Sequence, residues 1–264
     1  MGIINQLIGI PELASEHGEL VDLMLEVVHW FMLLLFVGWS IFFFYVLIRY
    51  HRSNNKVANY EGVTGHASTH LEIGVVIVEA ILLLGFAFPL WAQRVDQVPV
   101  GDDVVKVRAV GEKFAWSFHY PGPDGVFGLV DHHLISGTNP VGLDKEDPNA
   151  ADDFIARNEL VLPLGKKVVI SITSKDVIHN LALVPMRISH DATPGVTTTI
   201  WFKPTKMSSP EGWDIICGQL CGPGHALMKA KLHVRTPDAY AEWFKENSPT
   251  PAAPAAEATE SAAQ

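Results

Sequence analysis

Charge is scarce near the start of this 264-residue chain. No side chain with a formal charge occurs in residues 27–48, and residues 73–92 hold a single acid, Glu79. About 20 apolar residues suffice to cross the hydrocarbon core of a bilayer, whereas an apolar run in a buried core helix is usually about 10–14 residues long. The two runs therefore predict membrane-spanning helices at 27–50 and 72–93, with core helices of a soluble protein as the alternative.

Basic residues are also missing at the start, because residues 1–26 contain no Lys or Arg. The same segment carries five acids: Glu12, Glu16, Glu19, Asp22 and Glu26. A secretory signal needs a basic n-region, so we expect residues 1–26 to be an external segment instead. The connection between the two helices contains Arg49, Arg52 and Lys56, which favours the cytoplasmic side for it. This predicts a helical hairpin at 27–93 in a bacterial inner membrane, with both termini outside.

The chain is also poor in basic residues and in cysteine, and each of these features argues against a class of function. The chain has 19 basic against 29 acidic residues, and its net charge of −10 argues against nucleic-acid binding and favours a basic partner. It has only two cysteines, Cys217 and Cys221, and no C-x-x-C-H motif for haem attachment. We therefore expect no haem in this chain.

After residue 94 the sequence consists of short runs rich in β-forming residues, separated by Gly, Pro and Asp. Alternating apolar residues predict strands at 104–110, 114–120, 167–173, 181–184, 197–202, 213–216 and 228–234. Strands at such spacing favour an antiparallel sandwich or barrel over 94–247. Residues 137–158 read as an acidic insert, and 237–247 as a closing amphipathic helix with Trp243 and Phe244 on one face. The Pro/Ala/Glu-rich stretch 248–264 is predicted to be disordered.

Candidate metal ligands are concentrated in the run Cys217-x3-Cys221-x3-His225-x2-Met228. Thiolate, imidazole and thioether ligands suit copper. Two thiolates four residues apart can each bridge two copper ions, so the loop predicts a binuclear electron-transfer centre. Met228 would be a weak donor to one ion, and the backbone carbonyl of Gln219 would be the weak donor to the other.

A second imidazole must come from elsewhere in the chain. His179 follows Asp176-Val-Ile at the end of a predicted strand, 38 residues before Cys217, and neighbouring strands could bring it to the loop. Asp176 could orient the imidazole through a hydrogen bond. The alternatives are a disulfide between Cys217 and Cys221, a zinc site, for which Met is a poor ligand, and buried structural thiols.

Together these motifs resemble subunit II of haem-copper cytochrome c oxidases over nearly the whole chain. The resemblance is carried by the copper loop and by three further motifs: Asp176-Val-Ile-His179, Asp191-Ala-Thr-Pro194-Gly195 and Gly111-Glu-Lys-Phe-Ala-Trp116-Ser-Phe. It implies a cupredoxin-like domain with a binuclear CuA centre. That centre would take electrons from cytochrome c and pass them to haem in subunit I, where oxygen is reduced to water and protons are pumped. Implied partners are subunit I, subunit III, a c-type cytochrome donor and membrane lipids.

This sequence departs from the family at two positions. The family usually has Glu between the cysteines, where that carboxylate helps bind Mg at the border with subunit I. This chain has Gln219, so the resemblance does not extend to that ion. The family also offers a Trp where electrons enter. This chain has Phe114 there, with Trp116 nearby, and the alternative for Trp116 is a core aromatic.

Two acids of the second helix bear on proton uptake. Glu72 falls where the family places an acid at the mouth of a proton channel, although an acid at a helix N-terminus is also favoured by the helix dipole. Glu79 lies deeper, and an ionisable group inside a span is a functional candidate, with a paired carboxyl against subunit I as the alternative. Two other functions stay open: the CuA subunit of a nitric oxide reductase, and a membrane-tethered copper-binding protein without an enzyme partner.

Overall fold

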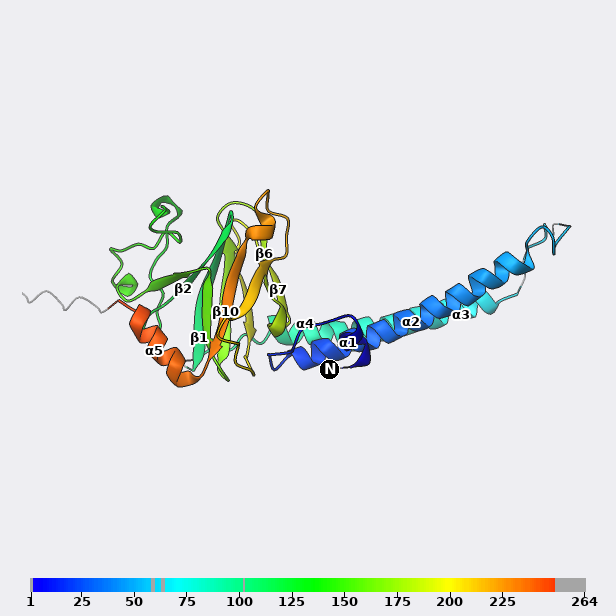
Figure 1. The fold of residues 1–264 in the computed structure, drawn as a ribbon, viewed down its shortest axis with the longest axis horizontal. Coiled ribbons are helices and arrows are strands. Elements are labelled where there is room, and N and C mark those ends of the chain that lie inside the picture. Colours follow the sequence, from blue (N-terminus) through cyan, green and yellow to red (C-terminus); the bar gives the residue numbers. More distant parts are fainter. Residues whose placement is uncertain (1, 58–59, 63–64, 102, 250–264) are drawn as a thin grey trace, which may run out of the picture. The chain divides into compact units, whose positions relative to one another are not determined.

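The computed structural model describes residues 2–57, 60–62, 65–101 and 103–249. The chain divides into two compact units, a helical one (Met1–Glu12 and His17–Gln97) and a β-rich one (Leu13–Glu16 and Val98–Gln264). Figure 1 draws the helices of the first and the two sheets of the second. The predicted fold class, two apolar helices followed by a β-sandwich, is confirmed. Most of the predicted disordered tail, residues 250–264, lies outside the described residues.

The helical unit contains two helices that are long and apolar enough to cross a membrane, Gly18–Arg49 and Ala67–Gln93. Its elements are α1 (Ile3–Leu7), α2 (Gly18–Arg49), α3 (Ala67–Leu82), a π-helical turn (Leu83–Ala87) and α4 (Phe88–Val95). The π-helical turn ends two residues before Pro89. Proline lacks an N–H and its ring crowds the carbonyl four residues earlier, so the widened turn absorbs a clash within one continuous helix.

Helix α2 begins nine residues before the predicted start at residue 27. The polar residues ahead of the apolar run form helix because α1 folds back on them. The Glu26 carboxylate accepts from Ile4 N at 3.0 Å and Asn5 N at 3.1 Å, so it satisfies free donors at the start of α1. Asn5 Nδ2 in turn donates to Asp22 O at 2.8 Å. The predicted external segment is therefore helical at Ile3–Leu7 and from Gly18 onward.

The β-rich unit is a sandwich of two five-stranded sheets, with strand orders β3-β2-β1-β5-β8 and β4-β10-β9-β6-β7. The first sheet contains β1 (Val104–Glu112), β2 (Ala115–Tyr120), β3 (Phe154–Arg157), β5 (Lys167–Ser174) and β8 (Thr198–Phe202). The second contains β4 (Glu159–Pro163), β6 (His179–Leu183), β7 (Ile188–Ala192), β9 (Trp213–Cys217) and β10 (Lys229–Arg235). Short 3₁₀ turns occur at His132–Leu134, Pro148–Ala150, Val184–Met186 and His225–Leu227.

The prediction of an antiparallel sandwich was wrong in two places, since β1 pairs with β5 and β10 with β4 in parallel. Alternation of apolar residues reports which face is buried but not the direction of the neighbouring strand. Strand β7 was missed as well. So were strands β3 and β4, and β3 lies within the predicted acidic insert. Only Asn158 separates them, and its φ of 55° turns the chain from one sheet into the other.

Helix α5 (Pro237–Asn247) covers one end of the sandwich, with the bounds that the sequence predicted. Its Trp243 is buried and meets Tyr120 edge-on at 5.3 Å between ring centroids and Phe154 at 5.6 Å. Phe244 packs against the same core cluster. This aromatic layer closes the core at that end of the domain.

Candidate metal centre

The loop 217–228 joins β9 to β10 and carries five of the six predicted ligands. Its ends are tied together by Cys217 N donating to Met228 O at 3.3 Å. Inside the loop, His225 N donates to Gly222 O at 3.0 Å and Met228 N donates to His225 O at 3.2 Å. The loop thus closes through a short 3₁₀ turn at His225–Leu227, which places Met228 beside Cys217 at the end of β9.

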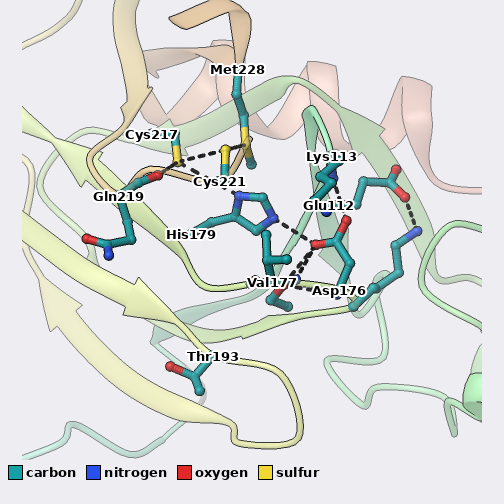
Figure 2. A network of polar contacts seen from close by, with 12 residues as sticks. Glu112, Lys113, Asp176, Val177, His179, Thr193, Cys217, Gln219, Cys221 and Met228 are labelled. Atoms are coloured by element: carbon teal, nitrogen blue, oxygen red, sulfur yellow. Dashed lines mark hydrogen bonds and ion pairs between the residues drawn. The ribbon is translucent and has the colours of Figure 1, made fainter. Parts of the chain in front are cut away.

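The sulfur atoms of Cys217, Cys221 and Met228 lie beside the ring of His179 (Figure 2). Cys217 Sγ lies 3.9 Å from Cys221 Sγ and 3.8 Å from His179 Nδ1. Cys221 Sγ lies 3.7 Å from His225 Nδ1 and 3.9 Å from Met228 Sδ. The sixth predicted donor, the carbonyl oxygen of Gln219, is 3.2 Å from Cys217 Sγ. The structure therefore brings all six predicted groups to one place.

These separations fit shared metal ions. Sulfur ligands lie about 2.3 Å and imidazole nitrogens about 2.0 Å from an ion such as zinc, so two donors of one ion stand up to about 4.3–4.6 Å apart. Every separation between neighbouring donors in the loop is below that limit. Both cysteines are free, and 3.9 Å is far longer than the ~2.05 Å of a disulfide. The donor set of two thiols, two imidazoles, a thioether and a carbonyl suits copper better than zinc.

Most of the centre is buried, whereas His225 is partly exposed and Gln219 is exposed. His179 and Met228 are fully buried, and the two cysteines are nearly so. Burial, together with the neighbouring Cys217, raises the pKa of the Cys221 thiol to about 11. A bound metal ion would favour the deprotonated thiols and offset this cost.

Asp176 fixes the orientation of His179 from the side opposite to the sulfurs. Its Oδ1 accepts from His179 Nε2 at 2.9 Å, and its Oδ2 accepts from Lys113 N at 2.8 Å (Figure 2). Burial acts to raise the pKa of Asp176, but the hydrogen bonds from His179, Lys113 N and Val177 N outweigh it and hold this pKa below its ordinary value. The carboxylate thus leaves Nδ1 of His179 facing Cys217.

We expect Asp176→Ala to weaken copper binding, because the imidazole loses the acceptor that fixes its tautomer and orientation. Removal of such a partner typically costs about 10–100-fold in metal affinity. Competition with a copper chelator measures the change. Asp214→Ala is the matched control, since Asp214 forms only an exposed ion pair with Lys231. Equal copper retention in both variants would contradict the role given to Asp176.

Glycine at two positions permits close approach to the site, and sequence reasoning attached no role to either. A Cβ on Gly111, in β1, would lie 3.0 Å from Cδ2 of His179, so this strand passes directly against the imidazole. A Cβ on Gly224 would lie 2.4 Å from Cδ2 of Phe114. A glycine inside a strand signals such an approach, but Gly111 lies one residue beyond the predicted strand 104–110 and inside β1 only in the structure.

The two aromatic residues predicted at the electron entrance lie in different environments. Phe114 is partly exposed and packs on the metal-binding loop at Gly222 and Gly224. Trp116 is fully buried and meets His179 edge-on, with ring centroids 6.1 Å apart. Phe114 therefore connects the loop to the surface, whereas Trp116 is part of the core beside His179.

Three acids of the predicted insert accept backbone hydrogen bonds from residues 124–129, which precede the insert. Asp147 accepts from Leu129 N at 2.7 Å, and Asp152 accepts from Asp124 N at 3.1 Å. Asp153 is buried and accepts from Gly128 N at 2.8 Å. These carboxylates hold an otherwise irregular loop together.

The two acids of the second helix lie in the helical unit, outside the metal centre. Glu72 is in the second turn of α3, because the helix starts at Ala67, and the helix dipole acts mainly within the first turn. Glu79 lines a groove between α2 and α3 together with Val28, Phe31 and Leu35. Glu79 therefore faces the neighbouring helix within the hairpin.

Fold and site define a class: a cupredoxin-like domain with a cluster of copper-type ligands, on a chain with two candidate membrane helices. A family model, cytochrome c oxidase subunit II, periplasmic domain, matches residues 105–234. The alternative cytochrome c oxidase subunit 2 of Bradyrhizobium diazoefficiens is 32% identical over 228 residues, which are 86% of this chain and 79% of that protein. Cytochrome c oxidase subunit 2 of Cereibacter sphaeroides is 28% identical over 238 residues, 83% and 75% of the two chains.

Among solved structures, the periplasmic domain of subunit II of cytochrome oxidase (CoxB) of Bradyrhizobium japonicum is similar to this chain. It is 28% identical and matches 57% of this chain and 96% of its own length, with a TM-score of 0.40. The sequence matches establish the family: this chain belongs to the cytochrome c oxidase subunit II family. It is thus a subunit of a haem-copper oxidase, and the predicted resemblance is confirmed.

Proposed function

We propose that this chain is the subunit through which electrons enter the oxidase, and that its residues hold a binuclear CuA centre. The observation that carries the proposal is the convergence of two thiols, two imidazoles, a thioether and a carbonyl oxygen in one largely buried cluster. The ligands would be His179, Cys217, Gln219 through its carbonyl, Cys221, His225 and Met228. When bound, the copper pair supplies a one-electron carrier.

The chain's own contribution is to hold these donors in a nearly fixed geometry. Electron transfer is fast when the ligand positions change little between redox states. Cys217 and Met228 are joined by a backbone hydrogen bond, and His179 is held by Asp176. The buried surroundings exclude water from the thiolates. Gln219 presents an exposed amide where the family has a carboxylate, so a magnesium ion at this position would lose a charged ligand.

The donor we propose is a c-type cytochrome, received at Phe114, whose partly exposed ring lies on the metal-binding loop. The net charge of −10 favours a basic donor by electrostatic steering. Electrons would pass from the copper pair to haem in subunit I, where oxygen is reduced to water and protons are pumped. Subunit III and membrane lipids are further partners, and Trp116 contributes as packing beside His179.

We further propose that α2 and α3 cross a bacterial inner membrane. Arg49, Arg52 and Lys56 in the connection would lie in the cytoplasm, and the β-rich domain and both termini in the periplasm. Glu72 would then stand near the cytoplasmic end of its helix as an acid for proton uptake. Glu79, facing α2 at greater depth, would be a further group on that path.

The test is an EPR spectrum of the copper-loaded full chain in detergent, together with the copper content per chain. We expect two coppers per chain and a seven-line hyperfine pattern from one unpaired electron shared by two copper nuclei. Reduction by a c-type cytochrome, followed by stopped-flow absorption, should bleach that signal. One copper with a four-line pattern would overturn the binuclear assignment and favour a membrane-tethered copper-binding protein.

A further inference from the structure

One polar side chain beside the metal centre has no role so far. Asn180 directly follows His179 in β6 and is nearly buried. Its side-chain nitrogen donates to Asp191 Oδ1 at 2.7 Å, and its side-chain oxygen accepts from Ser189 Oγ at 3.0 Å. Both ends of the amide are therefore engaged by β7, and its orientation is determined.

The backbone of Asn180 connects β6 to the metal-binding loop. The pairing of β6 with β9 consists of Leu181 opposite Cys217 and Ala182 opposite Ile216. The pairing of β6 with β9 thus ends at Cys217, the first cysteine of the loop. One step further, Gly218 N donates to Asn180 O at 3.1 Å, so the first residue of the loop is tied to the residue after His179.

The side chain of Asn180 also forms the surface on which the loop rests. A Cβ on Gly218 would lie 2.6 Å from Asn180 Oδ1 and 3.1 Å from Asn180 Cγ, so the loop backbone runs directly over the amide. The amide cannot swing aside without losing its bonds to Asp191 and Ser189. Gly218 is required here by close approach rather than by a left-handed φ.

His179 is already restrained on its other sides. Asp176 holds its Nε2, and Gly111 and Trp116 pack against the ring. The separation that remains adjustable is the one between His179 and Cys217, whose Nδ1 and Sγ lie 3.8 Å apart. Asn180 is connected to both residues. It follows His179 directly in the chain, and it contacts Gly218, the residue after Cys217.

We propose that Asn180 is a positioning residue that sets the separation between His179 and Cys217 and thereby the geometry of the copper centre. This rests on the proposed function, because the geometry has a consequence only when copper is bound. Loss of the amide would let the loop shift at Gly218 and would change the overlap between the Cys217 thiolate and the metal. The reduction potential and the hyperfine pattern depend on that overlap.

The experiment compares five full-length chains in detergent: wild type, Asn180→Ala, Gly218→Ala, the double variant and Asn139→Ala. Asn139 is the matched control, because its amide anchors a loop through Leu134 O, Leu143 O and Leu143 N without touching the metal-binding loop. The readouts are the EPR hyperfine pattern, the reduction potential and the rate of copper loss to a chelator. Asn139→Ala should lower thermal stability and leave all three unchanged.

We expect Asn180→Ala to alter the hyperfine pattern, shift the potential and speed copper loss on the order of tenfold, as for other residues that orient ligands. Gly218→Ala should perturb the centre more strongly, because its methyl group would meet the amide. In the double variant this extra effect should largely vanish, because the methyl group then has room. If Asn180→Ala keeps the wild-type spectrum and potential, or if the two substitutions simply add, the positioning role is overturned.

Two further results separate the possible failures. A wild-type chain without a mixed-valence copper pair would overturn the proposed function itself, independently of Asn180. If Asn180→Ala does not fold, Ser189→Ala replaces it, because it removes only the hydroxyl donor to the amide and Ser189 is exposed. That variant must shift the hyperfine pattern in a chain of wild-type stability, and an unchanged pattern there contradicts the proposal.

Discussion

Cys221→Ser should abolish the binuclear copper centre while leaving the sandwich folded. Cys221 Sγ is the common neighbour of Cys217 Sγ, His225 Nδ1 and Met228 Sδ, at 3.7–3.9 Å from each. A serine hydroxyl is nearly isosteric, but it is a hard and weakly acidic donor that does not replace a bridging thiolate. We expect copper to fall from two ions to one or none per chain, with loss of the seven-line EPR pattern.

The matched control for this variant is Leu220→Ala. Leu220 precedes Cys221 in the same loop, and its side chain is 84% exposed. Its truncation removes surface from the loop and no donor atom, so two coppers should remain. Circular dichroism of both variants checks that the fold persists. A Cys221→Ser chain that still held a copper pair would show that the thiolate does not bridge the two ions.

The second large effect is expected on stability, from Asp153→Ala. Asp153 and His119 are both buried, and Asp153 Oδ2 lies 2.7 Å from His119 Nε2. The same oxygen accepts from Gly128 N at 2.8 Å. Nearby, Arg108 lies over the Phe127 ring, and burial lowers the pKa of Arg108 while the charge of Asp153 partly offsets this. The carboxylate thus joins β2 to the segment 121–153.

Removal of Asp153 leaves two buried donors, His119 Nε2 and Gly128 N, without their acceptor, and the half-buried Arg108 without its nearby counter-charge. Such a change typically costs about 3–5 kcal/mol. Thermal unfolding of the full chain should show a large fall in the midpoint. Asp103→Ala is the control, because Asp103 is exposed and pairs only with Lys166, and surface pairs contribute about 0–1 kcal/mol. Equal midpoints for the two variants would show that His119 does not need the carboxylate.

The ligand set could be predicted because most of it is local. Cys217, Cys221, His225 and Met228 lie within one twelve-residue loop, and ligand chemistry alone selects copper for that combination. His179 could be proposed because copper needs a second imidazole, but its predicted place at the end of a strand was wrong, since His179 is the first residue of β6 and the preceding strand ends at Ser174. The two candidate membrane helices could likewise be predicted, because the thickness of the hydrocarbon core requires an apolar run that is longer than those of most soluble helices.

The acidic insert shows where composition misleads. The acidic excess favoured a basic partner, but in the insert 137–158 Asp147, Asp152 and Asp153 accept backbone hydrogen bonds from residues 124–129. Acid side chains satisfy backbone donors in segments that have no regular ladder to do so. Counting charges in the sequence cannot distinguish these two uses of a carboxylate.

The sequence by itself determined the class of this protein: two apolar helices, a β-rich domain and a copper-type ligand loop, since each depends on neighbouring residues and on period or spacing. Only the tertiary structure decided the parallel pairing of β1 with β5, the buried pair of His119 and Asp153, and the place of Asn180 beneath Gly218. These features join residues that are far apart in the chain. Their energy comes from burial and close approach, which no local pattern of residues encodes.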